Sequence, residues 1–154
     1  MSRKLHHHLP TAAVVVAIVM TFAVEGHSRK RVDTVRMKVY VDRDRGGRVL
    51  CSLYDRSETW LSEDRIFRTT AVDVQGPWVT CVFRGVPAHH TYGIAALHDE
   101  DGDGEMDTNV IGLPLEGYAA SRDAHFVGIG KPEWEDASFR YRGGLSNQRT
   151  RMKY

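Results

Sequence analysis

Short stretches of this chain alternate between apolar and other residues. From position 35 to 41 every second residue is valine or methionine, and arginine, lysine and tyrosine separate them. A period of two predicts a β-strand with one face in the core. The same period returns from 48 to 54, and the intervening turn contains Gly46 and Gly47, which tolerate positive φ. We therefore predict that these two strands pair as a hairpin.

Five further strands are predicted along the chain, over residues 66–74, 78–84, 92–97, 137–142 and 150–154. Glycine and proline mark turns between many of them, at intervals typical of a sandwich or barrel. The expected fold is all-β, a small antiparallel β-sandwich of about seven strands, Ig-like or transthyretin-like. A long acidic, glycine-rich stretch from 99 to 131 interrupts the pattern, and a connection of this length is usually functional or internally bound.

The first 26 residues have the pattern of a secretory signal peptide. Arg3 and Lys4 precede an apolar stretch from 12 to 24, which is too short to span a bilayer comfortably. Cleavage after Ala23 and cleavage after Gly26 both fit the small residues nearby. We expect a single domain over 27–154, secreted or periplasmic, with no stable membrane anchor after cleavage; the alternative is an uncleaved N-terminal anchor.

Composition narrows the classes of protein. The 154 residues include 21 basic and 20 acidic ones, a net charge of +1 that gives no general attraction to nucleic acid. The only cysteines, Cys51 and Cys81, lie at inward-facing positions of predicted strands. After an export signal, such a pair predicts a disulfide, and the alternative is two small buried side chains.

The acidic stretch matches most of a calcium-binding loop. Asp99, Asp101 and Asp103 occupy positions 1, 3 and 5 of the pattern D-x-[DN]-x-[DN]-G, and a glycine occupies position 6. Glu105 would contribute its backbone carbonyl at position 7, and Asp107 stands at position 9. Calcium takes six to eight oxygen ligands, which alternate acidic residues around a tight turn provide.

The match ends at position 12, where an EF-hand has glutamate and this chain has Val110. The stretch also follows a strand instead of a helix, so it is not an EF-hand. We expect a weak Ca²⁺ site closed by another residue, either Glu116 or Asn109. The alternatives are a solvated acidic turn without a metal and a site for another divalent ion.

Other chemistry has weaker support in the sequence. His89, His90, His98 and His125 would have to converge to make a transition-metal-handling protein, and their spacing fits no zinc motif. For His98 the simpler expectation is a hydrogen bond that orders the acidic loop. The loop carboxylates also permit a small hydrolase or carbohydrate-active enzyme. Trp134, flanked by acidic residues, fits an anchor in the fold better than a sugar-stacking platform.

A longer motif surrounds the acidic loop. The chain reads His98-Asp99-Glu100, then Gly102-Asp103-Gly104, Asp107, Asn109, Gly112, Pro114 and Glu116-Gly117-Tyr118. This pattern resembles the secreted bacterial family known as domain of unknown function 2141. Leu53-Tyr54-Asp55 upstream and Pro132, Trp134, Ala137 and Phe139 downstream resemble further segments of that family. Asp101 replaces the usual asparagine. The resemblance implies a signal peptide and a small β-sandwich, and it implies no activity.

These observations lead to one expected function. We expect a non-enzymatic binding or cell-envelope module with a calcium-stabilised loop. Its partner is an unidentified ligand or cell-envelope component and not a nucleic acid.

Overall fold

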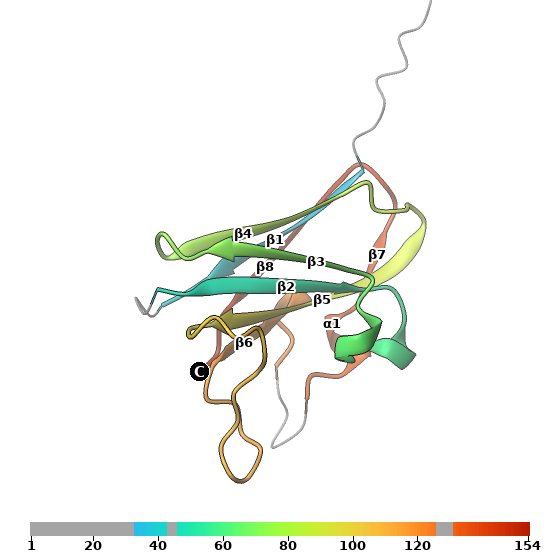
Figure 1. The fold of residues 1–154 in the computed structure, drawn as a ribbon. Coiled ribbons are helices and arrows are strands. Elements are labelled where there is room, and N and C mark those ends of the chain that lie inside the picture. The colour runs from blue at the N-terminus through green and yellow to red at the C-terminus, as the bar shows by residue number, and fades with distance from the viewer. Residues whose placement is uncertain (1–32, 43–45, 126–130) are drawn as a thin grey trace, which may run out of the picture.

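Two β-sheets stacked face to face make up the computed structural model, which describes residues 33–42, 46–125 and 131–154 (Figure 1). The first sheet has the order β4-β1-β8, where β4 is Trp78–Arg84, β1 is Thr34–Tyr40 and β8 is Leu145–Arg151. The predicted all-β sandwich is confirmed. The pairing of β1 with β8 is parallel, so the sandwich is not wholly antiparallel.

The second sheet has the order β3-β2-β5-β6. Its strands are β3 (Arg68–Asp73), β2 (Arg48–Tyr54), β5 (His90–Asp99) and β6 (Gly117–Ala120). The short strand β7 (Phe139–Tyr141) pairs with the N-terminal end of β5. The helical turns lie outside the sheets: η1 (Ser57–Thr59), η2 (Glu63–Arg65), η3 (Ser121–Asp123) and α1 (Trp134–Ala137).

The predicted hairpin between the first two strands is wrong. β1 and β2 belong to different sheets, so the chain passes from one sheet to the other between Tyr40 and Arg48. The reason is that both edges of β1 are occupied, by β4 on one side and by β8 on the other. β2 instead pairs with β3 on one side and with β5 on the other, both antiparallel.

Several strand boundaries also differ from the predictions. The last strand begins at Leu145 instead of near Thr150, and α1 takes up the start of the strand expected from Ala137. The long stretch after β5 contains β6, which no alternating pattern marked. β6 is only four residues long, and its buried positions are filled mainly by glycine and alanine.

The core lies between the two sheets and is filled by alternate side chains of the longer strands. They include Val35, Met37, Val39, Val49, Leu53, Val79, Phe83, Tyr92, Ile94 and Ala96. Within this core Cys51 of β2 is disulfide-bonded to Cys81 of β4, with 6.3 Å between their Cα atoms. The predicted disulfide is thus confirmed, and it joins the two sheets.

The expected signal peptide, residues 1–26, lies outside the described residues. Among the residues that the structure does describe, none of the helices is long and apolar enough to cross a membrane.

Candidate functional site

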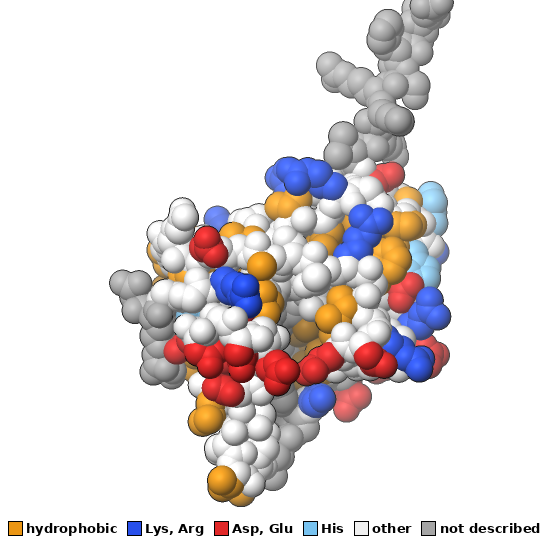
Figure 2. Space-filling model, in the orientation of Figure 1, with side chains coloured by type: hydrophobic (Ala, Val, Ile, Leu, Met, Phe, Trp, Pro, Cys, Tyr) orange, Lys and Arg blue, Asp and Glu red, His pale blue; other side chains and the backbone are white. Residues whose placement is uncertain are grey.

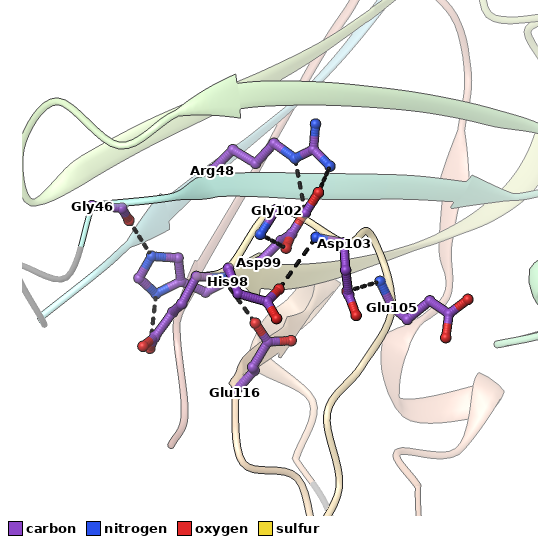
Figure 3. A network of polar contacts seen from close by, with 10 residues as sticks. Gly46, Arg48, His98, Asp99, Gly102, Asp103, Glu105 and Glu116 are labelled. Atoms are coloured by element: carbon purple, nitrogen blue, oxygen red, sulfur yellow. Dashed lines mark hydrogen bonds and ion pairs between the residues drawn. The ribbon is translucent and has the colours of Figure 1, made fainter.

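The acidic loop begins inside a strand. β5 extends to Asp99, so His98 and Asp99 are strand residues, and both are completely buried. The Asp99 carboxylate accepts a 2.8 Å hydrogen bond from Nε of Arg48 at the start of β2 (Figure 3). It also accepts a 2.8 Å bond from the N–H of Gly102, and Arg48 donates in turn to the Gly102 carbonyl. Asp99 and Arg48 therefore fix the first turn of the loop.

These contacts decide the ionisation of Asp99. Burial raises the pKa of this carboxyl, because desolvation disfavours the charged form. Hydrogen bonds from Arg48 and from the N–H groups of Gly102 and Gly104, together with the Arg48 charge, outweigh the burial. The pKa of Asp99 is consequently held below its ordinary value, and the residue is a carboxylate at neutral pH.

The structure brings three of the predicted calcium ligands together. Carboxylate oxygens of Asp99, Asp101 and Asp103 lie within 4.8 Å of one another, and the last two residues are exposed. Asp101 accepts a hydrogen bond from the N–H of Asp103, and Asp103 accepts one from the N–H of Glu105, at 3.2 and 2.8 Å. Such side-chain-to-backbone bonds are typical of tight aspartate turns.

The side chains of the other predicted ligands are not part of this cluster, and coordination by the Glu105 backbone carbonyl stays a prediction. Glu105 and Asp107 have exposed side chains. Glu116 is buried next to β6 and accepts hydrogen bonds from the N–H groups of Glu100 and Asp107, at 2.8 and 3.4 Å. The Glu116 carboxylate thus joins Glu100 to Asp107 by accepting from their backbone N–H groups.

Asn109 shapes a different part of the loop. Its side-chain oxygen accepts hydrogen bonds from the N–H groups of Ile111 and Leu113, at the tip of a narrow hairpin. A bridge between Thr108 and Pro114 closes that hairpin, which projects from the body of the sandwich (Figure 1). Of the two residues expected to close the metal site, Glu116 therefore lies at the base of the loop and Asn109 at its tip.

His98 makes both of its ring hydrogen bonds outside the acidic loop, and its Nδ1 also lies 3.8 Å from the Glu100 carboxylate within the loop. Its Nε2 is 2.8 Å from the Gly46 carbonyl and its Nδ1 is 2.8 Å from the Tyr154 hydroxyl. A carbonyl only accepts, so Nε2 donates, and in the neutral ring Nδ1 accepts from Tyr154. His98 thereby ties Gly46, just before β2, and Tyr154, at the end of the chain, to β5.

The four histidines that the structure describes do not converge on a metal site. His90 contacts the Asp55 carbonyl, and His125 lies 3.8 Å from the Asp123 carboxylate. Within the described part of the chain, the aspartate cluster is the only group of three or more potential metal-ligating side chains.

A groove of about 380 Å³ lies beside the acidic loop, on the outer face of the five-stranded sheet. Outward side chains of β2, β5 and β6 form its floor, among them Leu50, Ser52, Ala95, Leu97 and Tyr118. Its walls include Leu61 and Ile66 on one side, Met106 and Leu113 of the acidic loop on another, and Pro132. On this side of the molecule, Asp and Glu side chains form a band (Figure 2).

Tyr54 lines the groove and packs against an aromatic residue behind it. Tyr54 and Trp60 contact each other edge to face, with ring centroids 5.2 Å apart. The indole N–H of Trp60 donates a 2.7 Å bond to the carbonyl of Pro132, which does line the groove. Burial, with a smaller contribution from the charge of Glu63, raises the pKa of Tyr54 to about 12, so its hydroxyl stays protonated.

Trp134 is an anchor in the fold. It packs edge to face on Trp60, at 5.6 Å between centroids. Both indoles lie directly over Gly93 of β5, where an added Cβ would come within 2.9 Å of each. The absence of a side chain at Gly93 is what lets the two tryptophans rest on the sheet.

A family model described as "Uncharacterized protein conserved in bacteria (DUF2141)" matches residues 38–149. The chain belongs to this family. The match confirms the resemblance drawn from the sequence, and it extends from within β1 to within β8. The acidic loop and the groove of this DUF2141 domain therefore both lie inside the matched region. No curated protein and no solved structure matches the chain.

Sequence reasoning missed two parts of the site in this DUF2141 domain. Arg48 is 51 positions away from Asp99, and no local pattern links them. The groove is built from outward residues of three strands and from three connecting segments. The only indication in the sequence was that some outward strand positions hold leucine, such as Leu50 and Leu97, which suggests that this face of the sheet is partly covered.

Proposed function

We propose that this chain is a non-enzymatic, extracytoplasmic binding module that takes a ligand in the groove, and that Ca²⁺ orders the acidic loop forming one wall. One observation carries the proposal: the aspartate cluster and the groove share a segment. Gly104 and Met106 line the groove directly after Asp103, the last residue of the cluster. Ordering the aspartates would therefore set the shape of the groove.

Three converging carboxylates are the main support for calcium. Asp101 and Asp103 are exposed next to the buried Asp99, and three negative charges this close repel one another. Arg48 compensates Asp99 only, since its Nε contacts that carboxylate alone. A bound Ca²⁺ would neutralise the remaining charges, and exposed carboxylate, carbonyl and water oxygens would complete its coordination.

A non-enzymatic role is favoured by how the loop carboxylates are used. Asp99, Asp101, Asp103 and Glu116 each accept hydrogen bonds from backbone N–H groups. A general acid or base needs a carboxyl oriented towards a substrate within a cleft. Here the carboxylates shape the loop, and the groove beside them is mainly apolar.

An extracytoplasmic location is supported by the Cys51–Cys81 disulfide, because disulfides persist in oxidising compartments. The signal-like residues 1–26 point the same way. The composition of the groove favours a small ligand that is largely apolar with a few hydroxyl groups, for which Ser52, Thr108 and Tyr118 provide hydrogen-bonding partners.

The test uses Nile red, an uncharged apolar dye, as the probe. The mature chain should bind it saturably, with increased emission. Ala95→Trp fills the floor of the groove and should weaken binding at least about tenfold. Thr80→Trp, at an exposed position of the other sheet, is the matched control and should bind as the wild type does. Equal binding by the Ala95→Trp variant would overturn the assignment of the groove.

A further inference from the structure

The outer face of the three-stranded sheet carries an array of cations. The outward-facing basic residues of its strands are Arg36, Lys38, Arg84, Arg149 and Arg151. The remaining outward positions are held by Thr34, Tyr40, Trp78, Thr80, Val82, Leu145 and Asn147, so none of them is acidic. The small net charge of the chain conceals this concentration of positive charge.

Strand register arranges these cations as a stripe. Arg84 of β4 stands opposite Thr34, and Arg36 follows two residues along the central strand. Lys38 and Arg149 are direct neighbours across β1 and β8, and Arg151 is opposite Tyr40. With about 3.3 Å per residue, the stripe crosses the face diagonally over about 20 Å.

Two aromatic rings hold three of the five cations in place. The Lys38 ammonium lies 4.6 Å from the centroid of Trp78, and the Arg149 guanidinium lies 5.3 Å from it. Arg151 lies over Tyr40 at 4.5 Å, and Tyr40 packs edge to face on Trp78. Cation–π contacts fix side chains that would otherwise be mobile, which lowers the entropic cost of binding an anion.

No described carboxylate forms an ion pair with any of the five cations of this stripe. Asp123 is nearby at the edge of β8, where it bonds the Thr150 hydroxyl and the backbone N–H of Arg151. Its carboxylate is used to fasten the strand edge, and the cations remain available.

We propose that this face binds a linear anionic polysaccharide, a function separate from the groove on the other sheet. A diagonal stripe of cations is complementary to an extended chain carrying repeated negative charges. The Cys51–Cys81 disulfide indicates an oxidising compartment, where acidic polysaccharides occur and cytosolic nucleic acids do not.

The same face is poorly suited to other polyanions. Single-stranded nucleic acid stacks its bases on aromatic platforms, but here the rings of Trp78 and Tyr40 already contact cations of the stripe. The major groove of a duplex admits a helix or a two-stranded ribbon, and this is a three-stranded sheet. A bilayer surface favours several exposed apolar side chains beside the charges, whereas on this face only Leu145 and Trp78 are large, exposed hydrophobic residues, and the Trp78 ring already contacts two cations.

The test measures binding of the mature chain to two anionic polysaccharides, sulfated heparin and carboxylated alginate, with neutral dextran as the negative control. We expect binding to both anionic chains that weakens as salt rises, and none to dextran. Arg36→Ser with Arg149→Ser should weaken binding at least about tenfold and make the salt dependence shallower. Arg56→Ser with Arg65→Ser, which removes the same charge from exposed positions outside the two sheets, should bind as the wild type does.

A second variant tests the aromatic platform. Trp78→Leu keeps every charge but removes the ring under Lys38 and Arg149, so it should weaken binding about threefold or more, and Trp78→Phe should restore part of it. Equal binding by the two double variants would overturn the proposal. Tighter binding to a single-stranded DNA oligonucleotide, or to vesicles with anionic phospholipid, than to either polysaccharide would also overturn it.

Discussion

Gly47 is the residue at which the connection between the two sheets passes over the end of β5. Its φ is +70°, and an added Cβ would lie 2.4 Å from the Asp99 carbonyl oxygen and 2.9 Å from Cα of Glu100. Gly47→Ala should therefore destabilise the fold by about 2–4 kcal/mol, since it combines a left-handed backbone with a clash against backbone atoms. Urea unfolding measures the loss.

Gly46 provides the matched control for this prediction. Its φ is +71°, but no atom lies within 4 Å of the position of an added Cβ. Gly46→Ala carries only the backbone cost, about 1 kcal/mol. Equal losses in the two variants would mean that the close approach of Gly47 to β5 contributes nothing.

Tyr54 gives the protein a specific sensitivity to alkali. Its pKa is raised to about 12 in the folded state, whereas an unfolded tyrosine titrates near 10. The raised pKa contributes stability that is fully present below pH 10 and is lost as pH rises towards 12. At pH 11 the free energy of unfolding should be lower by about 1.4 kcal/mol.

The measurement is urea unfolding of the wild type and of Tyr54→Phe at pH 9 and pH 11. We expect the wild type to lose more stability over this interval than the variant, by about 1 kcal/mol. Parallel losses in the two proteins would show that Tyr54 titrates normally.

At this scale the sequence predicted some residues well. The disulfide between Cys51 and Cys81 and the positive φ of Gly46 and Gly47 were both predicted from local chemistry. Asp99, Asp101 and Asp103 were expected to converge, and their oxygens do. The role of Arg48 was not predictable, because its pairing with Asp99 depends on the register of β2 against β5.

The disulfide acts at the scale of elements, because it joins β2 of one sheet to β4 of the other. Its 30-residue separation corresponds to about 3–4 kcal/mol in the chain-entropy model. Reduction of the wild type should lower its stability by up to this amount. Unfolding in urea with and without a phosphine reductant measures it, with Cys51→Ala plus Cys81→Ala as the variant that reductant should not affect. An unchanged wild type would contradict the prediction.

Alternating patterns predicted strands far better than they predicted partners. β1, β2 and β4 lie where a period of two placed them. The predicted partner of β1 was wrong. Proximity in sequence favoured β2, but β1 pairs with β4 and β8, which are further along the chain. β8 was displaced in the prediction because its outward residues are mainly polar and its inward ones include Ser146 and Gln148.

At the scale of the whole molecule, charge is separated between the two sides of the sandwich. The acidic loop follows β5 of one sheet, and the cation stripe covers the outer face of the other. Net charge alone predicted no affinity for polyanions, because it averages these two regions. The separation became visible only when strand register placed the basic residues of β1, β4 and β8 on one face.

Calcium binding by the acidic loop is the central claim, and a thermal melt of the mature chain in EDTA and in excess calcium tests it most directly. For a Kd near 1 mM, 10 mM Ca²⁺ should add about 1.4 kcal/mol and raise Tm by several degrees. Asp101→Ala and Asp103→Ala should abolish this shift, and magnesium should do much less because it requires octahedral geometry. The same Tm in EDTA and in calcium, with no heat of binding up to several millimolar, would contradict the account.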